Sequence, residues 1–189
     1  MKLENDVCSV QISVDSTYTM QSADNKYYDI ELNPDNYTHS DFYKVLAIHI
    51  NVFDGTIDIA FVGNFYSYDI DCAHLDGYIL TILQNDMISQ IKVTDGTITF
   101  HKRFDCFGCT YGLYRVPNGY IVYGEIEIVM LDLQFNKKCS FLGRDIFVSC
   151  SSKKAFEICE TSIHLYDWQN NYYEIDFNGN LLCERISSK

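Results

Sequence analysis

Two cysteines at the spacing of a redox or metal-binding motif are the first residues that could do chemistry. Cys106 and Cys109 enclose Phe107-Gly108 in a CxxC pattern. Redox motifs of this spacing usually open a helix, whose N-terminus lowers the pKa of a thiol, but here Thr110-Tyr111-Gly112 follows without a helical pattern. A structural zinc site would need a second ligand pair at suitable spacing, and the other cysteines stand singly. We therefore favour free thiols over a redox pair or a zinc site, and we predict no metal and no cofactor.

The five histidines form no motif of catalysis or metal binding, such as HxH, HxxxH or HExxH. His49 and His164 lie within apolar runs, where a histidine is more often a satisfied core residue than a ligand. Cys72 and His74 would share one face of a strand, but a nucleophilic pair also needs a group that orients the base and an oxyanion hole. The chain has no P-loop, no GxGxxG and no GxSxG. We predict no catalytic residue and no enzymatic activity.

An acidic segment in the first half of the chain is one candidate contact surface. Asp69 and Asp71 are two residues apart, which on a strand places both carboxylates on one face, and Asp76 follows shortly after. A calcium loop would need more oxygen ligands at the spacing of an EF-hand, which is missing. Glycosidase carboxylates are recognised by their separation in space, which the sequence does not give. A solvated acidic face is the favoured interpretation.

The densest cluster of aromatic and acidic residues lies near the C-terminus. It consists of Asp167-Trp168 with Tyr172 and Glu174, and it contains the only tryptophan. Trp and Tyr are typical anchors of protein interfaces, so the cluster suits a basic partner. A core position for Trp168 between two sheets is the competing and favoured interpretation. The predicted partner-binding residues are Asp69, Asp71, Asp76, Asp167, Trp168, Tyr172 and Glu174.

Composition limits the kinds of partner. The 189 residues carry 26 Asp and Glu against 14 Lys and Arg, a net charge of −12. Such a field repels nucleic acid, whose binding depends on Lys and Arg that neutralise phosphates, and it repels anionic membranes. It attracts a basic protein, although acidity that serves solubility alone is the simpler account. Neither a secretory signal nor an apolar run of ~18 residues is present, so we expect a cytoplasmic protein with reduced cysteines.

The elements that would position these residues are strands. Apolar residues alternate with period two, as in Val7–Val14 and Thr56–Val62, which is typical of half-buried strands. Asp or Asn precedes Gly in hairpin-type dipeptides, because these residues tolerate the positive φ of such turns; we expect hairpin turns at Gly55, Gly96 and Gly179. The pattern predicts a single all-β domain over residues 1–189, with antiparallel three- to four-stranded units at about 74–106, 116–150 and 155–187.

The spacing of strands and turns around Gly77, Gly96, Gly119 and Gly179 resembles that of β-propeller proteins over roughly residues 74–187. The resemblance implies stacked, propeller-like sheets. It implies no activity, because propellers host many unrelated functions, and the Trp-Asp blade ending and the kelch double glycine are absent. An antiparallel β-sandwich or an open meander would leave similar patterns.

Together these features favour a non-catalytic, acidic interaction protein. Its size, acidity, expected cytosolic thiols and missing catalytic motifs resemble the general profile of bacterial immunity proteins, which implies an inhibitor of a basic toxin such as a nuclease. One alternative is a small-ligand or carbohydrate-binding propeller module or hydrolase, which would show a concave pocket with convergent polar groups. Another is a scaffold or assembly subunit, which would expose a large apolar patch.

Overall fold

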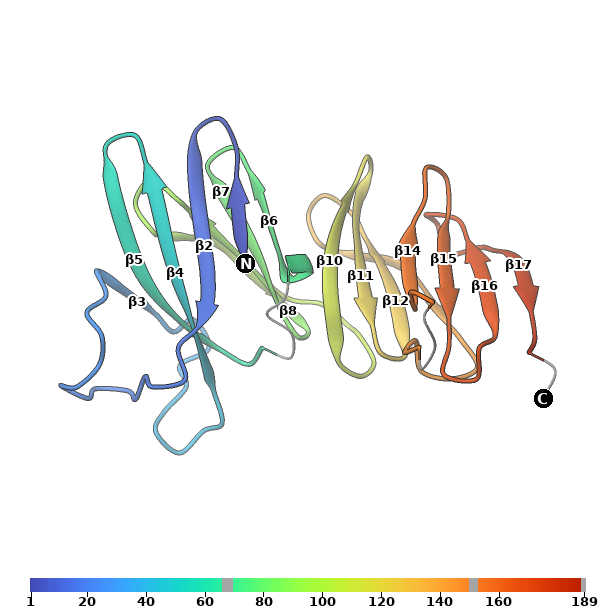
Figure 1. Cartoon of the computed structure of the whole chain (residues 1–189), viewed down its shortest axis with the longest axis horizontal. Coiled ribbons are helices and arrows are strands. Elements are labelled where there is room, and N and C mark those ends of the chain that lie inside the picture. Colours follow the sequence, from blue (N-terminus) through green and yellow to red (C-terminus); the bar gives the residue numbers. More distant parts are fainter. Residues whose placement is uncertain (66–69, 150–152, 188–189) are drawn as a thin grey trace. The chain divides into compact units, whose positions relative to one another are not determined.

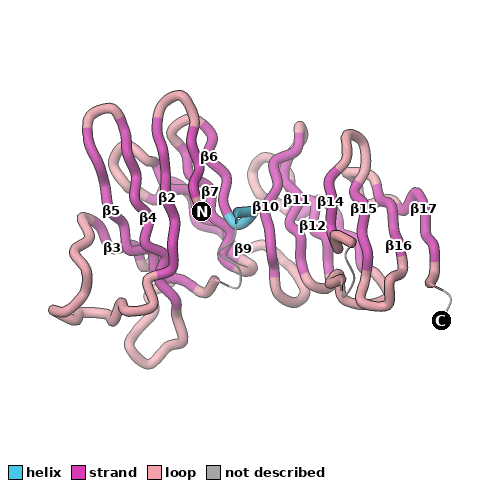
Figure 2. Tube along the Cα trace, in the orientation of Figure 1, coloured by secondary structure: helices cyan, strands magenta, loops and turns pink. Residues whose placement is uncertain are grey.

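The strands form because apolar and polar side chains alternate along them. In the computed structural model, which describes residues 1–65, 70–149 and 153–187, Val10 and Ile12 are buried while Gln11 and Ser13 between and beyond them are exposed. The described residues form seventeen strands and one 3-10 helix (Figures 1 and 2). The predicted all-β fold of repeated antiparallel units is therefore confirmed. In the same ranges no helix has the length and apolar character needed to cross a membrane.

Contacts group the chain into two compact units, Met1–Arg103 and Phe104–Lys189, here named the N-terminal unit and the C-terminal unit. Each unit contains two sheets, and most of their strands are labelled in Figure 1. That the whole chain folds as one domain stays a prediction.

The N-terminal unit packs a five-stranded sheet against a four-stranded one. The first sheet has the order β1-β2-β4-β5-β3, with β3 parallel to its neighbour, and the second is the meander β6-β7-β8-β9. Ile12, Ile48 and Phe61 of the first sheet share a buried cluster with Leu80 and Ile91 of the second, so the core lies between the sheets. The strands are β1 (Lys2–Glu4), β2 (Cys8–Val14), β3 (Ile30–Leu32), β4 (Lys44–Val52), β5 (Gly55–Gly63), β6 (Ala73–Asp76), β7 (Ile79–Gln84), β8 (Met87–Lys92) and β9 (Ile98–Arg103).

The C-terminal unit consists of two four-stranded antiparallel meanders, β10-β11-β12-β13 and β14-β15-β16-β17. Ile121 and Met130 of the first sheet pack in one buried cluster with Leu165 and Tyr173 of the second, and Phe147 from the connecting segment completes it. The strands are β10 (Thr110–Val116), β11 (Gly119–Gly124), β12 (Glu127–Leu131), β13 (Lys137–Leu142), β14 (Phe156–Ile158), β15 (Ile163–Tyr166), β16 (Tyr172–Ile175) and β17 (Leu181–Arg185).

The three predicted hairpin turns are present. β4 and β5 are joined through two residues, with Val52 opposite Gly55. Gly96, between β8 and β9, has a φ of 69°, and Gly179, between β16 and β17, has a φ of 77°. Glycine adopts this left-handed conformation without the steric cost that a side chain brings. The turn dipeptides therefore locate these hairpins correctly.

The sequence pattern misses β10 and expects a strand at Asp71 where there is none. The unit expected to begin at residue 116 begins with β10 at Thr110, whereas the unit expected to begin at about residue 74 begins with β6 at Ala73. Gly112 and Arg115 interrupt the apolar alternation of β10. The strand expected around Asp69 and Asp71 is wrong at Asp71, because Ile70–Cys72 forms the 3-10 helix η1. Asp69 lies outside the described residues.

Candidate functional site

The predicted acidic and aromatic residues lie in different units. Asp71 is half-buried in η1 and Asp76 is exposed at the end of β6, both in the N-terminal unit. Trp168, Tyr172 and Glu174 lie in the C-terminal unit, on β16 and the turn before it. Asp71 and Asp76 therefore do not lie on one strand. The contacts of Asp167, Trp168 and Tyr172 define the aromatic cluster more closely.

Asp167 holds a turn and does not face solvent. It is completely buried, and its carboxylate accepts hydrogen bonds from the backbone N–H groups of Gln169 (3.0 Å) and Asn171 (2.9 Å), the Asn171 amide (2.9 Å) and the Tyr173 hydroxyl (2.8 Å). Burial and the Asp167 carboxylate raise the pKa of Tyr173 to about 12, so its hydroxyl stays a donor. Asp167, predicted to meet a partner, is instead a structural residue, because its four acceptor positions are used internally.

Trp168 is exposed, so the favoured core interpretation is wrong. Its exposed fraction is 52%. β15 ends at Tyr166, and Asp167 takes the inward position of the turn, which leaves the next side chain outside. The Trp168 backbone N–H donates to the carbonyl of Ile146 (2.9 Å), and Asn170 closes the turn with a φ of 63°. Trp168 is thus a large aromatic side chain on a fixed turn.

Other aromatic and apolar side chains lie at the same end of the sheet. Tyr172 is opposite Arg185 in the β16–β17 register, and the guanidinium of Arg185 lies 5.1 Å from the centre of the Tyr172 ring. The Ser187 backbone N–H donates to the side chain of Asn171 (2.9 Å), which keeps the exposed Ile186 beside the turn. We name Trp168, Tyr172, Arg185 and Ile186 the Trp168 surface. It is aromatic and apolar, and it is bordered by the carboxylate of Glu174, which accepts a hydrogen bond from the Tyr172 hydroxyl (3.4 Å).

The same turn occurs three times in the C-terminal unit. Asp132, Asp167 and Asp176 each begin a five-residue turn that ends in Asn, and each carboxylate accepts from the backbone N–H and the side-chain amide of that Asn. The Asn180 amide and further donors lower the pKa of Asp176. The pattern Asp-x-x-x-Asn can be read in the sequence. A search for turn dipeptides that contain glycine does not find the turns at Asp132 and Asp167, because neither turn contains a glycine.

A cavity of about 420 Å³ lies in the C-terminal unit between its two sheets. Its apolar walls come from β10 to β12 and from the segment after β16, and polar side chains of turns stand at its rim. Pockets of this size with a few convergent polar groups are the usual form of small-ligand sites. The lining includes Val116, Tyr120, Ile121, Met130, Leu131 and Phe177 as apolar residues and Asn118, Lys138, Glu160, Thr161 and Asn178 as polar ones.

One arrangement in the N-terminal unit has the chemical order of a hydrolase triad. The His101 ring lies 3.0 Å from Asp35 Oδ1 through Nε2 and 2.8 Å from Ser89 Oγ through Nδ1. Ser89 is completely buried and its hydroxyl also donates to Gln84 Oε1 (2.9 Å). A serine nucleophile must reach its substrate, so this network is structural. Cys72 is likewise buried, and it ends η1 instead of sharing a strand with His74.

Two histidines differ from their expected settings, whereas the CxxC thiols lie in a segment without a helix, as the sequence pattern indicates. Cys106 and Cys109 are half-buried in the segment between β9 and β10, and burial together with Glu125 raises the pKa of Cys109, which opposes redox activation. His49 and His164, expected in the core, are 40% and 32% exposed and stand 2.9 Å from Asp58 and 3.7 Å from Glu174. Each is on the solvent face of its strand, opposite a carboxylate on the next strand.

Known proteins resemble this chain in structure and not in sequence. No protein-family model and no curated protein sequence matches it. Among solved structures it is similar to the Pan2 WD40 domain of Neurospora crassa (16% identity, 64% of this chain and 40% of that chain, TM-score 0.45). It is also similar to BamB of Moraxella catarrhalis (10% identity, 90% and 54%, TM-score 0.47) and to the computationally designed Ika8 protein (9% identity, 77% and 46%, TM-score 0.47). The chain spans about half the length of these structures.

Proposed function

We propose that this chain is a non-catalytic interaction protein that binds a basic protein partner through the Trp168 surface. The observation that carries the proposal is the 52% exposure of Trp168 on a turn whose first residue, Asp167, is buried and fully hydrogen-bonded. A tryptophan held in place before binding loses little conformational freedom on association. Tryptophan is also the residue type most enriched among interface hot spots.

The charge of the chain favours a basic partner, and it is unevenly distributed. Residues 1–103 contain 15 Asp and Glu against 6 Lys and Arg, whereas residues 104–189 contain 11 against 8. The field that would attract a basic protein therefore comes mainly from the N-terminal unit. A nuclease toxin presents Lys and Arg for phosphates, so it is the kind of partner that such a field would attract.

Site-specific photo-crosslinking tests the proposal and captures whichever partner binds. A photoreactive benzoyl-phenylalanine would replace Trp168, and in a matched control it would replace Phe53, which is completely exposed at the β4–β5 turn. We expect position 168 to give one dominant adduct with a basic protein and position 53 to give none. Equal adducts from both positions, or an acidic partner at position 168, would contradict the proposal.

A second candidate function is the binding of a small ligand such as a sugar, and the cavity of about 420 Å³ favours it. Phe177 lines the cavity with an aromatic side chain, and Asn118 and Asn178 offer amides that can pair with hydroxyl groups. Thermal shift with a panel of mono- and disaccharides tests it. We expect a stabilising sugar whose effect is lost in Asn118→Ala and kept in Trp168→Ala; a panel without any shift would rule out this ligand class.

A further inference from the structure

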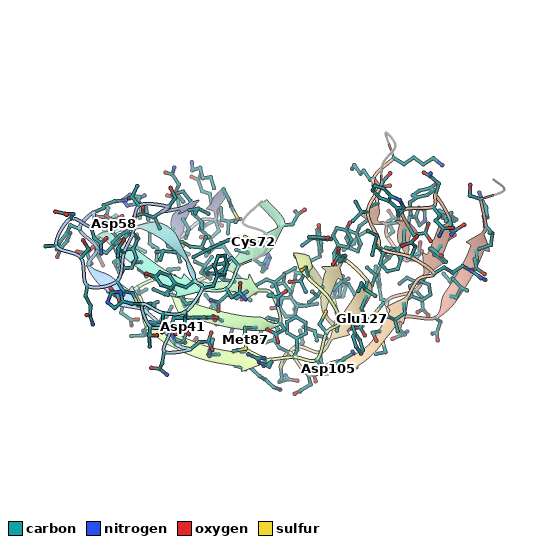
Figure 3. The ribbon with its side chains drawn as sticks, turned by 90° about the horizontal axis from the view of Figure 1, so that it is seen from below. Asp41, Asp58, Cys72, Met87, Asp105 and Glu127 are labelled. Carbon is teal, nitrogen blue, oxygen red and sulfur yellow. The ribbon has the colours of Figure 1, made fainter. Side chains whose placement is uncertain are left out.

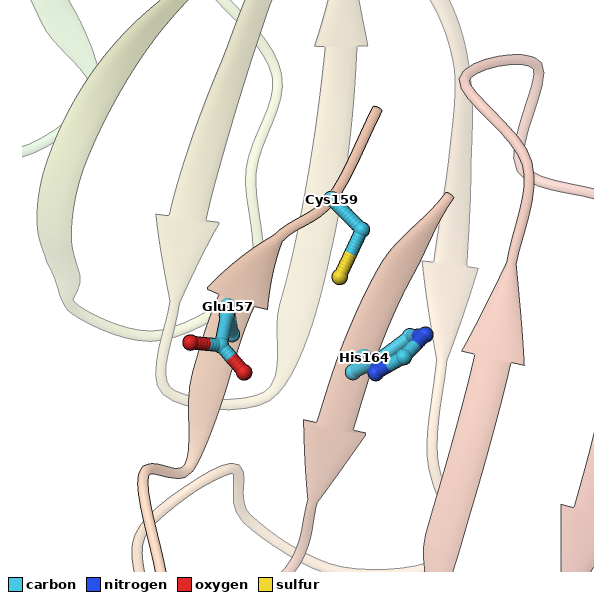
Figure 4. Close-up of side chains that lie close together, drawn as sticks. All are labelled: Glu157, Cys159 and His164. Carbon is cyan, nitrogen blue, oxygen red and sulfur yellow. The ribbon is translucent and has the colours of Figure 1, made fainter. Parts of the chain in front are cut away.

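Three side chains of different ligand type converge on one face of the β14–β17 sheet. One ligand atom each from Glu157, Cys159 and His164 lies within 4.8 Å of the other two (Figure 4). Glu157 on β14 is directly opposite His164 on β15. Cys159 follows the end of β14, where its backbone N–H donates to the carbonyl of Ser162 (2.8 Å) and closes the hairpin. The hairpin register therefore brings the three groups together.

The chemistry of the three ligands points to zinc. A thiolate, an imidazole and a carboxylate are the ligands that Zn²⁺ takes from proteins, whereas Mg²⁺ and Ca²⁺ prefer oxygen alone. Zn–S is about 2.3 Å and Zn–N about 2.0 Å, so ligand atoms of a tetrahedral site lie roughly 3.5 Å apart. The groups would need to close by about 1 Å. Glu157 is exposed, whereas Cys159 and His164 are half-buried. We expect rotation of these side chains to make the adjustment.

Two neighbouring charges bear on the site. Glu174 on β16 is opposite His164, with Oε1 3.7 Å from Nε2, so a second carboxylate stands beside the imidazole as a ligand or as the group that orients the ring. Lys154 Nζ lies 3.4 Å from Glu157 Oε1 and competes for that carboxylate. Both members of this pair are exposed, and exposed pairs contribute little, so a divalent cation can displace the ammonium group.

We propose that Cys159, His164 and Glu157 bind one Zn²⁺ ion, with water in the remaining position. Binding requires the Cys159 thiolate, and its proton passes to solvent. The ion would tie the edge strand β14 to β15 and leave the open coordination position toward solvent. The inference does not depend on partner binding. It differs from the sequence-based expectation of no metal because the ligands meet across two strands and not within a recognised motif.

Zinc and cobalt titrations of the full chain test the site. After treatment with a chelator, we expect calorimetry to give one Zn²⁺ per chain, and Co²⁺ to give a thiolate charge-transfer band with the visible bands of tetrahedral cobalt. Cys159→Ser and His164→Gln should each weaken Zn²⁺ binding at least about ten-fold, and Cys159→Ser should abolish the charge-transfer band. Circular dichroism of the metal-free variants checks that they fold.

Cys183→Ser is the matched control, because Cys183 lies on the same sheet opposite Glu174 but outside the cluster. We expect it to keep both the affinity and the cobalt spectrum. Three results would overturn the proposal: no stoichiometric binding of Zn²⁺, an unchanged spectrum in folded Cys159→Ser, or loss of the spectrum in Cys183→Ser.

Discussion

The two units of the chain differ in the part of binding that each can provide. The N-terminal unit has a net charge of −9, from 15 acidic and 6 basic residues, whereas the C-terminal unit has a net charge of −3, from 11 and 8. The C-terminal unit instead contains the Trp168 surface and the cavity of about 420 Å³. In the proposed function, long-range attraction comes mainly from the N-terminal unit and short-range anchoring from the C-terminal unit, so each can be changed by itself.

Phe53 and Trp168 show that exposure alone does not make an anchor. Phe53, in the N-terminal unit, is completely exposed at a two-residue turn, so it has no packing to hold it. Trp168 is 52% exposed, and the turn that carries it is fixed by the buried Asp167 and by a backbone hydrogen bond to Ile146. In the second case the backbone that carries the side chain is preorganised for a partner.

The largest effect is expected from removing the carboxylate that fixes the Trp168 turn. Asp167→Ala leaves two backbone donors, an amide and the Tyr173 hydroxyl without their acceptor in a buried site. We expect the free energy of unfolding to fall by about 3 kcal/mol or more, because buried unpaired donors cost about 1–3 kcal/mol each and some will regain water. Urea unfolding followed by the fluorescence of Trp168, the only tryptophan, reports this in the C-terminal unit.

Asp132→Ala is the matched control for that change, because Asp132 makes the same turn in a half-exposed position. Its loss should cost about 1 kcal/mol, since water replaces the missing acceptor. Equal losses in the two variants would contradict the view that burial makes Asp167 the residue that fixes the anchor.

A smaller effect with a clear pH dependence is expected at Glu127, which is buried in β12 and labelled with Asp105 in Figure 3. Burial opposes its ionisation, but hydrogen bonds from Lys137 Nζ (2.7 Å) and the Phe107 N–H (2.9 Å) outweigh this and hold its pKa below the ordinary value of 4.5. The stabilisation is therefore present above about pH 4.5 and is lost as the pH falls through the lower folded pKa.

Glu127→Gln should cost about 1.5–2 kcal/mol at about pH 7, because a charged hydrogen bond is replaced by a neutral one beside Lys137. It should also flatten the loss of stability below pH 4.5. Unfolding curves at about pH 7, 5 and 4, which lie on both sides of the ordinary carboxyl pKa, measure both effects. A variant that keeps the full acid sensitivity of the native chain would show that other carboxylates cause it.

Turn chemistry makes most of the fold predictable, whereas the candidate site depends on features that sequence does not display. Gly96 and Gly179 locate hairpins because the required φ is a local property. The exposure of Trp168 follows from where β15 ends, and the pairing of His164 with Glu157 follows from strand register. Both are set by tertiary packing. The sequence gives the total net charge. The concentration of acidic residues in the N-terminal unit can be recognised only once the structure shows where that unit ends.

The smallest effect is expected from charges in the N-terminal unit. Asp71→Asn with Asp76→Asn should slow association with the crosslinked partner about two-fold at low salt, with little change in dissociation, because charges outside the buried interface act mainly on the encounter. The effect should vanish at high salt, where screening reduces the reach of the field to about 3 Å at 1 M. Stopped-flow kinetics at two salt concentrations measure this change in the association rate. An equal effect from Glu125→Gln with Glu160→Gln in the C-terminal unit would contradict the proposal that the N-terminal unit attracts the partner.

The affinity and the melting temperature of Trp168→Ala, measured on the same preparation, test the central claim most directly. If Trp168 anchors the partner captured at position 168, the variant should lose about 2 kcal/mol or more of binding free energy with a nearly unchanged melt, and Phe53→Ala should lose neither. A loss of about 3–5 kcal/mol in the free energy of unfolding, as for a buried aromatic residue, or an unchanged affinity would contradict the account.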